Sequence, residues 1–326
     1  MLKKFREFYK ISPPAKPLDG GKKEQDRLYK KLRFQAFLAG TIGYSLYYVC
    51  RTTLNVVKKP IIDSGALDAQ QLGIISSALL FSYAIGKFVN GLLADHSNIK
   101  RFMATGLAVS VVANLAVGLL GFSFAGGGVG SAVFFLVFAI MWGVNGWSQS
   151  MGAAPAIIAL SRWFPLKQRG TYYGFFSASH NIGEGISFVF VSLVVGLAGW
   201  QWGFIGSSIA GIIGVIVILF MLHDNPQSKG LPRVEVLTGE DAEEAPKPDG
   251  GKSVGSSQKL VFKNPYIWIL ALASACMYIS RYAVNSWGVI FLQEIKGFEL
   301  TQASFIIAVN AVLGVVGTVF SGLISD

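Results

Sequence analysis

The chain has 326 residues, of which 52% are hydrophobic and only 14% are charged, and its mean hydropathy is +0.51. Soluble domains carry about 25% charged residues, so a soluble fold could not cover this much apolar surface. The apolar content excludes disorder, the aperiodic glycines exclude collagen, and two cysteines are too few for a disulfide scaffold. A polytopic membrane protein remains, and its net charge of +10 has to be located before it can be interpreted.

Eight apolar stretches are long enough to cross a bilayer, which takes roughly 20 residues per helix. Their apolar residues run continuously instead of alternating, so they predict helices and not the strands of a barrel. In chain order, the predicted spans cover residues 34–57, 72–94, 102–124, 131–160, 172–197, 201–222, 264–292 and 302–324.

Lys and Arg are distributed unevenly between the segments that join these spans. The segment 1–33 and the loops after the second, fourth and sixth spans hold 22 of the 28 basic residues, and the opposite side holds only Lys58, Lys59 and Lys296. Basic segments stay in the cytoplasm, so we expect a multi-pass protein of the cell (inner) membrane with a cytoplasmic N-terminus. Most of the charge thus orients helices, and it does not indicate nucleic-acid binding.

The first and seventh spans share one spacing of polar residues. Tyr48-x-x-Arg51-x-x-x-Asn55 recurs as Tyr278-x-x-Arg281-x-x-x-Asn285, an offset of 230 residues. The ends of the second and eighth spans, Gly91-Leu-Leu-Ala-Asp95 and Gly322-Leu-Ile-Ser-Asp326, match at an offset of 231. Two matches at nearly one offset predict a duplicated six-helix unit, which resembles the parallel repeat of the major facilitator superfamily.

This repeat predicts the domain organisation. We expect a cytoplasmic N-terminal segment (1–33), an N-terminal six-helix bundle (34–222), a cytoplasmic linker (223–263) and the first two helices of a C-terminal bundle (264–326). The chain is then expected to be a fragment that lacks the last four helices, and an eight-helix protein complete in itself is the alternative.

Three basic residues fall inside predicted spans, namely Arg51, Lys87 and Arg281, and Glu184 is the one acid well inside a span. Each buried base costs roughly 2.5–3.5 kcal/mol at a helix centre, so the surplus of two positive charges needs a function. Phosphate groups carry about −1.5 to −2 near pH 7, and the arginine fork binds two phosphate oxygens at once. Snorkelling to the interface is the alternative for each single residue, but the two Arg are repeat-related. The sequence therefore predicts a phosphate site between the halves.

Polar and aromatic residues accompany the two arginines. Tyr44 and Tyr48 lie seven and three residues before Arg51 on one helical face, and Tyr278 and Asn285 flank Arg281. These side chains suit a sugar or glycerol phosphate, because they form hydrogen bonds and offer ring faces to an apolar sugar surface.

Two further residues have open roles. Lys87 is either a third anion ligand or a snorkelling side chain, and His180 is either a satisfied structural group or a protonatable phosphate partner. Glu184, one turn after His180, can pair with that imidazole or with Lys87.

Several strings resemble the organophosphate:phosphate antiporter family of this superfamily. The loop from Asp95 to Arg101 resembles the superfamily's signature, in which an acid faces basic residues on the next helix. The string Phe262-Lys-Asn264-Pro-Tyr-Ile-Trp268 is most similar to the hexose-phosphate branch, which includes transporters and a sensor. The other strings are Tyr44-x-x-x-Tyr48-x-x-Arg51, Gly86-Lys87-Phe88, Arg169-Gly170-Thr171, Ser179-His180-Asn181-Ile182-Gly183, Tyr278-x-x-Arg281 with Trp287, and Asp224-Asn-Pro226-Gln-Ser-Lys-Gly230-Leu-Pro232.

The resemblance implies an all-α major facilitator fold, without a cofactor or a metal, that works as a monomer. It would exchange a phosphorylated sugar for inorganic phosphate by a rocker-switch motion of two six-helix halves. By matching position, Arg51 and Arg281 would clamp the phosphoryl group, and Lys87, His180, Tyr44 and Tyr278 would line the same cavity. The alternative is a sensor of the same fold that signals to a membrane histidine kinase; an enzyme finds no support.

One position departs from the family pattern. Family members usually have Gly where Glu184 stands in this chain. An added carboxylate beside an anion site would lower the affinity, couple transport to protons, or favour a ligand other than a hexose phosphate.

Overall fold

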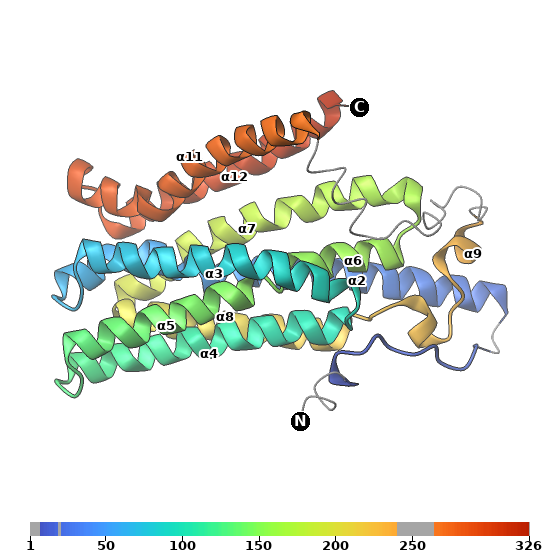
Figure 1. Cartoon of the computed structure of the whole chain (residues 1–326), viewed down its shortest axis with the longest axis horizontal. Helices are drawn as coiled ribbons and strands as arrows, with labels where there is room; N and C mark the ends of the chain where they lie inside the picture. The colour runs from blue at the N-terminus through green and yellow to red at the C-terminus, as the bar shows by residue number, and fades with distance from the viewer. Residues whose placement is uncertain (1–6, 19–20, 240–263, 326) are drawn as a thin grey trace.

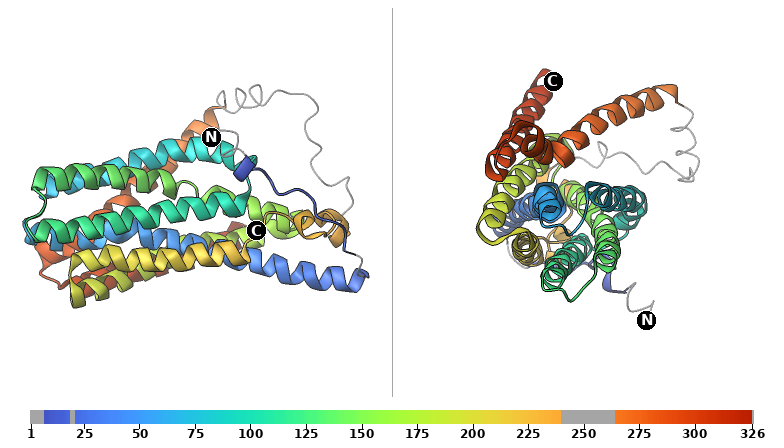
Figure 2. Two further views of the ribbon diagram at one scale, coloured as in Figure 1. Left: turned by 90° about the horizontal axis from the view of Figure 1, so that it is seen from below. Right: turned by 90° about the vertical axis from the view of Figure 1, so that its left-hand side faces the viewer.

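The computed structural model describes residues 7–18, 21–239 and 264–325, with side chains as far as residue 317. Long helices lie side by side in a bundle, and the last two, α11 and α12, pack along one flank of it (Figures 1 and 2). The helices are α2 (Lys22–Asp63), α3 (Ala69–Asp95), α4 (Ile99–Ala125), α5 (Ser131–Gln149), α6 (Ala153–Trp163), α7 (Leu166–Ala198), α8 (Trp200–Met221), the 3-10 turn η1 (Pro226–Lys229), α9 (Val234–Thr238), α11 (Pro265–Lys296) and α12 (Leu300–Ser325).

All eight predicted spans coincide with helices, and the prediction of an all-α polytopic membrane protein is confirmed. The fourth span is divided into α5 and α6, with a break at residues 150–152. Polar side chains cap several of the helix starts, including those of α3 and α4. Asp68 and Gln71 form a capping box ahead of α3, and the side chain of Asn98 accepts from the backbone at the start of α4.

Among the described residues, seven helical stretches are apolar enough to cross a membrane, and α2 is not one of them. Its middle carries polar side chains that neighbouring helices cover instead of lipid. Thr52 donates to Ser187 on α7 and Thr53 to Ser207 on α8, each at an O–O distance of 2.6 Å. A central helix can therefore be less apolar than its neighbours, because protein satisfies its polar groups.

Glycines allow helices of the bundle to approach each other closely. A Cβ atom on Gly146 of α5 would collide with the carbonyl oxygen of Leu79 on α3. On α7, a Cβ atom on Gly183 would collide with the carbonyl oxygen of Ser45 and lie 2.7 Å from its Cα. Small residues at such crossings are typical of membrane helix bundles, and here they set the distance between α2 and α7.

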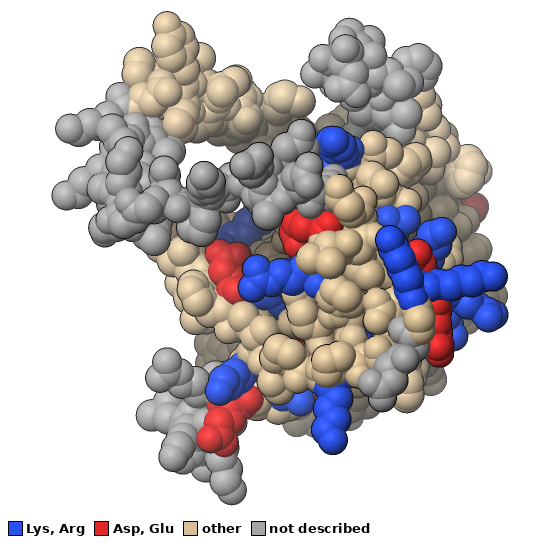
Figure 3. Space-filling model, turned by 90° about the vertical axis from the view of Figure 1, so that its right-hand side faces the viewer, with Lys and Arg blue, Asp and Glu red and all other residues tan. Residues whose placement is uncertain are grey.

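The end of the bundle that carries α9 is held together by a buried carboxylate. Asp224 is 3% exposed and accepts from the backbone nitrogens of Ser12 and Ile99 and from Nη1 of Arg162, at 2.7, 3.0 and 2.6 Å. Figure 3 shows Lys and Arg side chains gathered over this end. Residues 224–239 of the predicted linker thus pack as η1 and α9 against the bundle, and residues 240–263 lie outside the described residues.

The predicted pairing of Asp95 with the next helix takes a different form. Asp95 is exposed and contributes its backbone oxygen to Arg162 at 3.4 Å, whereas Arg101 donates to the backbone oxygen of Phe8 at 2.8 Å. No salt bridge joins Asp95 to Arg101 in the part of the chain that the structure describes. The acid that faces a basic residue here is Asp224, which lies between the end of α8 and η1.

Replacing Asp224 with Ala should destabilise the protein by about 3–5 kcal/mol, because it leaves Arg162 and two backbone donors without their buried acceptor. The measurement is thermal unfolding in detergent. Asp63→Ala is the matched control, because its pair with Lys59 is exposed and contributes only about 0.3–0.5 kcal/mol. Equal melting temperatures for the two variants would contradict the role given to Asp224.

Candidate functional site

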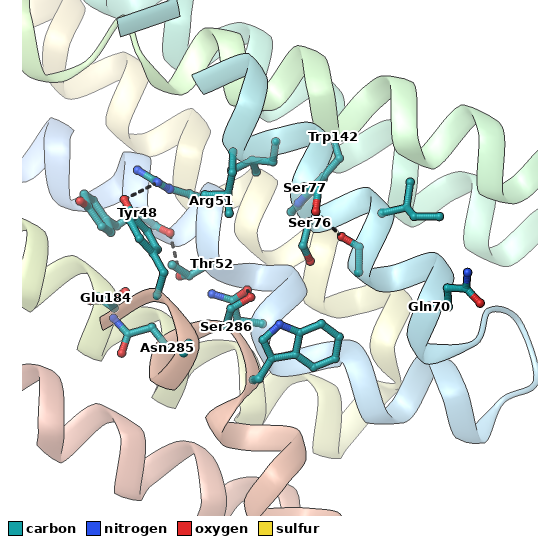
Figure 4. Close-up of a pocket in the computed structure, with 18 residues that line it drawn as sticks. Tyr48, Arg51, Thr52, Gln70, Ser76, Ser77, Trp142, Glu184, Asn285 and Ser286 are labelled. Atoms are coloured by element: carbon teal, nitrogen blue, oxygen red, sulfur yellow. Dashed lines mark hydrogen bonds between the residues drawn. The ribbon is translucent and has the colours of Figure 1, made fainter. Parts of the chain in front are cut away.

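A cavity of ≈ 590 Å³ lies between α2, α3 and α11 and reaches α5 and α7 (Figure 4). This volume falls within the roughly 300–1,000 Å³ of small-molecule sites. Residues from both sequence repeats line it. Its polar lining includes Tyr48, Arg51, Thr52, Glu184, Tyr282 and Asn285.

Arg51 is the buried cation of this cavity. It is 7% exposed, and its guanidinium carbon lies 4.1 Å from the ring centre of Tyr83 and 5.6 Å from that of Tyr48. Its Nη2 donates to the hydroxyl of Tyr282 on α11 at 3.0 Å. Ring faces and a hydroxyl therefore surround this charge, and no described carboxylate forms a salt bridge with it.

The backbone just before Arg51 is held from two other helices. The carbonyl oxygen of Cys50 accepts from Nδ2 of Asn114 on α4 at 2.9 Å and from Nδ2 of Asn145 on α5 at 3.2 Å. All three residues are buried. These bonds fix the position of α2 along its axis, and with it the position of Arg51, relative to α4 and α5.

Arg281 is engaged by three side chains of α7. Its Nη2 donates to Asn181 Oδ1 at 2.7 Å and to Glu184 Oε2 at 3.1 Å. Its Nη1 faces Nε2 of His180 at 3.2 Å. A guanidinium has no acceptor, so Nε2 must accept, and the imidazole is then neutral with its proton on Nδ1.

The two arginines belong to one cluster but have different surroundings. Arg51 lines the cavity, whereas Arg281 lies behind Glu184, which lines the cavity itself. Tyr48 lies between them, with its ring centre 6.0 Å from that of His180. The structure thus brings together both repeat-related arginines, as the offset of 230 residues predicts.

The remaining predicted residues divide into two groups. Asn285 is buried and lines the cavity, and Tyr44 is buried behind it, packed edge-on against Tyr48 with ring centres 5.4 Å apart. Tyr278 is 53% exposed and stacks on Tyr282, and Lys87 is exposed with its Nζ 5.4 Å from the ring centre of Tyr83. Neither Tyr278 nor Lys87 lines the cavity, so their roles as ligands stay predictions.

Sequence reasoning missed Lys58, which it placed in a loop. In the structure α2 continues to Asp63, and Lys58 is fully buried. Its Nζ donates to the backbone oxygen and the hydroxyl of Ser286 at 2.7 and 2.9 Å and lies 3.8 Å from the ring centre of Trp287. The position seven residues after Arg51, two helical turns along the same face, was the available signal.

Tyr282 was also missed. It joins the repeats through Arg51, yet the corresponding position of the first repeat is Thr52, so the internal match gives no signal for it. Asn181, which holds Arg281, was noted only as part of a string. Whether these side chains meet depends on how α11 is rotated about its own axis against α2 and α7.

Comparisons with known proteins are informative for most of the chain. The sequence profile of the Major Facilitator Superfamily matches residues 40–326. The "Probable hexose phosphate transport protein" of Chlamydia pneumoniae is 33% identical over 310 residues, which are 91% of this chain and 65% of that protein. The glycerol-3-phosphate transporter of Bacillus subtilis (strain 168) is 31% identical, over 98% of this chain and 70% of its own length.

Two other similarities bear on function and on fold. The membrane sensor protein UhpC of Escherichia coli (strain K12) is 29% identical over 97% of this chain and 70% of its own length. A bacterial homologue of the human lysosomal transporter Spinster superposes with a TM-score of 0.71 at 18% identity, covering 91% of this chain and 63% of that one. This chain thus spans about two thirds of the length of the proteins that it matches.

Proposed function

Because the chain belongs to the Major Facilitator Superfamily, in its organophosphate:phosphate antiporter branch, we propose that it exchanges a phosphorylated sugar or a related organophosphate for inorganic phosphate. This superfamily contains membrane transporters, and the proposed activity is transport rather than an enzymatic reaction. The ligands are then two phosphate-bearing anions that use one site in turn.

The cluster around Arg51 and Arg281 is the observation that carries this proposal. One arginine comes from each repeat, and the cavity beside them is also lined from both repeats. A buried arginine that is held by ring faces and not by a carboxylate keeps its charge for an anionic ligand. A phosphoryl group fits such a pair, because each guanidinium can donate two parallel hydrogen bonds to its oxygens.

The same contacts support alternating access by a rocker-switch motion. Helix α11 meets α2 through Tyr282 and Ser286, in its C-terminal half, whereas residues 264–279 are exposed and diverge from the bundle in Figure 2. A ligand that binds Arg51 and Arg281 together would draw α2 and α11 toward each other. Binding and closure are thereby linked.

We further propose a monomer in the cell inner membrane with the N-terminus in the cytoplasm. The excess of Lys and Arg at the end of the bundle shown in Figure 3 supports this orientation. The connections between helices agree with this orientation, because the joins between α3 and α4 and between α6 and α7, and the segment after α8, lie at the basic end that carries α9 (Figure 1).

A sensor is the second candidate, favoured by the similarity to a membrane sensor protein over nearly the whole chain. A sensor would bind the sugar phosphate at the same cluster and signal to a histidine kinase. The two candidates differ in one property, because only a transporter moves its ligand across the bilayer.

Phosphate self-exchange in proteoliposomes distinguishes them. We expect the reconstituted full-length protein to accumulate labelled phosphate against internal unlabelled phosphate, and external hexose 6-phosphate to compete. Protein-free liposomes are the control. Measurable binding of the sugar phosphate without any counterflow would refute the transporter and favour the sensor.

A further inference from the structure

The carboxylate of Glu184 occupies the place at which an anion would meet Arg281. Its Oε2 is 3.1 Å from Nη2 of Arg281, its side chain is only 6% exposed, and it lines the cavity that Arg51 also lines. Nη1 and Nη2 of Arg281 also face His180 and Asn181. A ligand that reaches Arg281 from the cavity therefore meets a carboxylate that is already bound there.

The charge of the cluster follows from the groups that face Glu184. Helices α6, α8 and α12 also pack on α7. The described side chains of α8 and α12 include no titratable group, and those of α6 include only Arg162, which is paired with Asp224. Two arginines and one carboxylate leave one net positive charge, because His180 is neutral when it accepts from Arg281. The groups that face Glu184 are Tyr48 and Arg51 on α2, His180 on α7, and Arg281 and Tyr282 on α11.

One positive charge does not match a phosphoryl dianion. Phosphate monoesters and inorganic phosphate approach −2 above neutral pH. A dianion that bound to both arginines would have to displace Glu184, and a displaced carboxylate, buried without a partner, is strongly disfavoured. If the carboxylate takes up a proton, it becomes neutral and can donate a hydrogen bond to the ligand.

We propose that Glu184 is a built-in counter-ion of Arg281 that phosphate displaces, so that each phosphoryl dianion is bound together with one proton. The inference rests on the proposed function and specifies its charge balance. In the binding step the Arg281–Glu184 ion pair breaks, an Arg281–phosphoryl pair forms, and a solvent proton joins the freed carboxylate oxygen. The complex of two arginines and one dianion is then neutral. A monoanionic phosphate would bring the same proton on its own oxygen.

The proposal predicts a specific dependence on pH. Above about pH 8 inorganic phosphate is almost entirely the dianion, so the proton for Glu184 must come from solvent, and the affinity should fall about tenfold per pH unit as one proton is taken up. In Glu184→Gln the amide oxygen can still accept from Arg281, but there is no charge to neutralise. The variant should bind the dianion with an affinity that is flat above pH 8.

Isothermal titration of the purified protein in detergent tests this, with inorganic phosphate as the probe between pH 6.5 and 9. Repeating each titration in buffers of different ionisation enthalpy counts the protons taken up. We expect about one proton per phosphate above pH 8 in the unmodified protein and close to none in Glu184→Gln. Glu294→Gln, which changes an exposed glutamate of α11, should behave as the unmodified protein.

Each other outcome overturns the inference. If phosphate binds to the unmodified protein without proton uptake, Glu184 is not a counter-ion that phosphate displaces, and the proposed function is unaffected. If proton uptake persists in Glu184→Gln, another group takes up the proton, and His180 is the nearest titratable side chain. Absence of phosphate binding in all proteins at every pH refutes the proposed function as well. If Glu184→Gln does not fold, His180→Gln decides instead, because it should keep the uptake of one proton.

Discussion

Replacing Arg51 by Lys is expected to reduce phosphate self-exchange by about 100-fold or more while the protein still inserts and folds. The charge is kept, but Lys cannot make two parallel hydrogen bonds to a phosphoryl group, nor can its compact ammonium replace the planar contact with Tyr83 and Tyr282. Losing a buried charge-assisted contact of this kind costs about 2–5 kcal/mol of binding. Arg281→Lys should have a similar effect, because the clamp needs both forks.

The measurement is initial exchange rate in proteoliposomes, normalised to the amount of monodisperse protein. Arg33→Lys is the matched control. This arginine is half-buried in the N-terminal part of α2, where it donates to Gln168, and it does not line the cavity, so its variant should exchange at the normal rate. Near-normal exchange by Arg51→Lys or Arg281→Lys would rule out the clamp.

Gly183→Ala should abolish phosphate binding and lower the melting temperature, although it adds a single methyl group. Gly183 lies between Asn181 and Glu184, both of which accept from Arg281, and its added Cβ would collide with the backbone of Ser45 on α2. Overpacking a core by one methylene typically costs about 1–3 kcal/mol. Here the added Cβ would collide with backbone atoms, which cannot rotate away as a side chain can. Helix α7 has to move off α2, which takes Asn181 and Glu184 away from Arg281.

Gly174→Ala provides the control on the same helix. A Cβ atom at Gly174 has no atom within 4 Å, so Ala there should stabilise the helix by about 0.5–1 kcal/mol. The melting temperature in detergent should therefore fall in Gly183→Ala and rise in Gly174→Ala, and phosphate affinity by titration should be lost in Gly183→Ala and unchanged in Gly174→Ala. Normal phosphate affinity in Gly183→Ala would show that the α2–α7 distance does not set the site.

The positions of the helices and the meeting of the two arginines could be predicted from the sequence, and the reasons are physical. Crossing a bilayer requires long apolar stretches, so composition marks each span. The two arginines are charged, expensive to bury, and separated by one repeat, so their meeting follows from the duplication. The family assignment made from the short motifs is confirmed, the superfamily by the match over residues 40–326 and the branch by the similar hexose-phosphate and glycerol-3-phosphate transport proteins.

Contacts that depend on how helices are rotated and how far they extend were not predictable in this way. Hydropathy ended the first span at Val57, because two lysines follow, yet Lys58 is buried by Ser286 and Trp287 on α11. Lys87 falls in a span but faces outward. Asp95 and Arg101 fit a signature by position, whereas the buried acid of that region is Asp224, more than 100 residues later.

The burial of Lys58 against Ser286 has a consequence for the speed of the protein. In the alternating-access cycle proposed above, α2 and α11 must part at this contact once per turnover, so the strength of the contact enters the rate at which the cavity changes sides. The main-chain oxygen of Ser286 is one of the two acceptors, so Ser286→Ala keeps half of the contact and Lys58→Met removes all of it. A contact that is too strong makes a slow exchanger, and one that is too weak lets ions pass uncoupled.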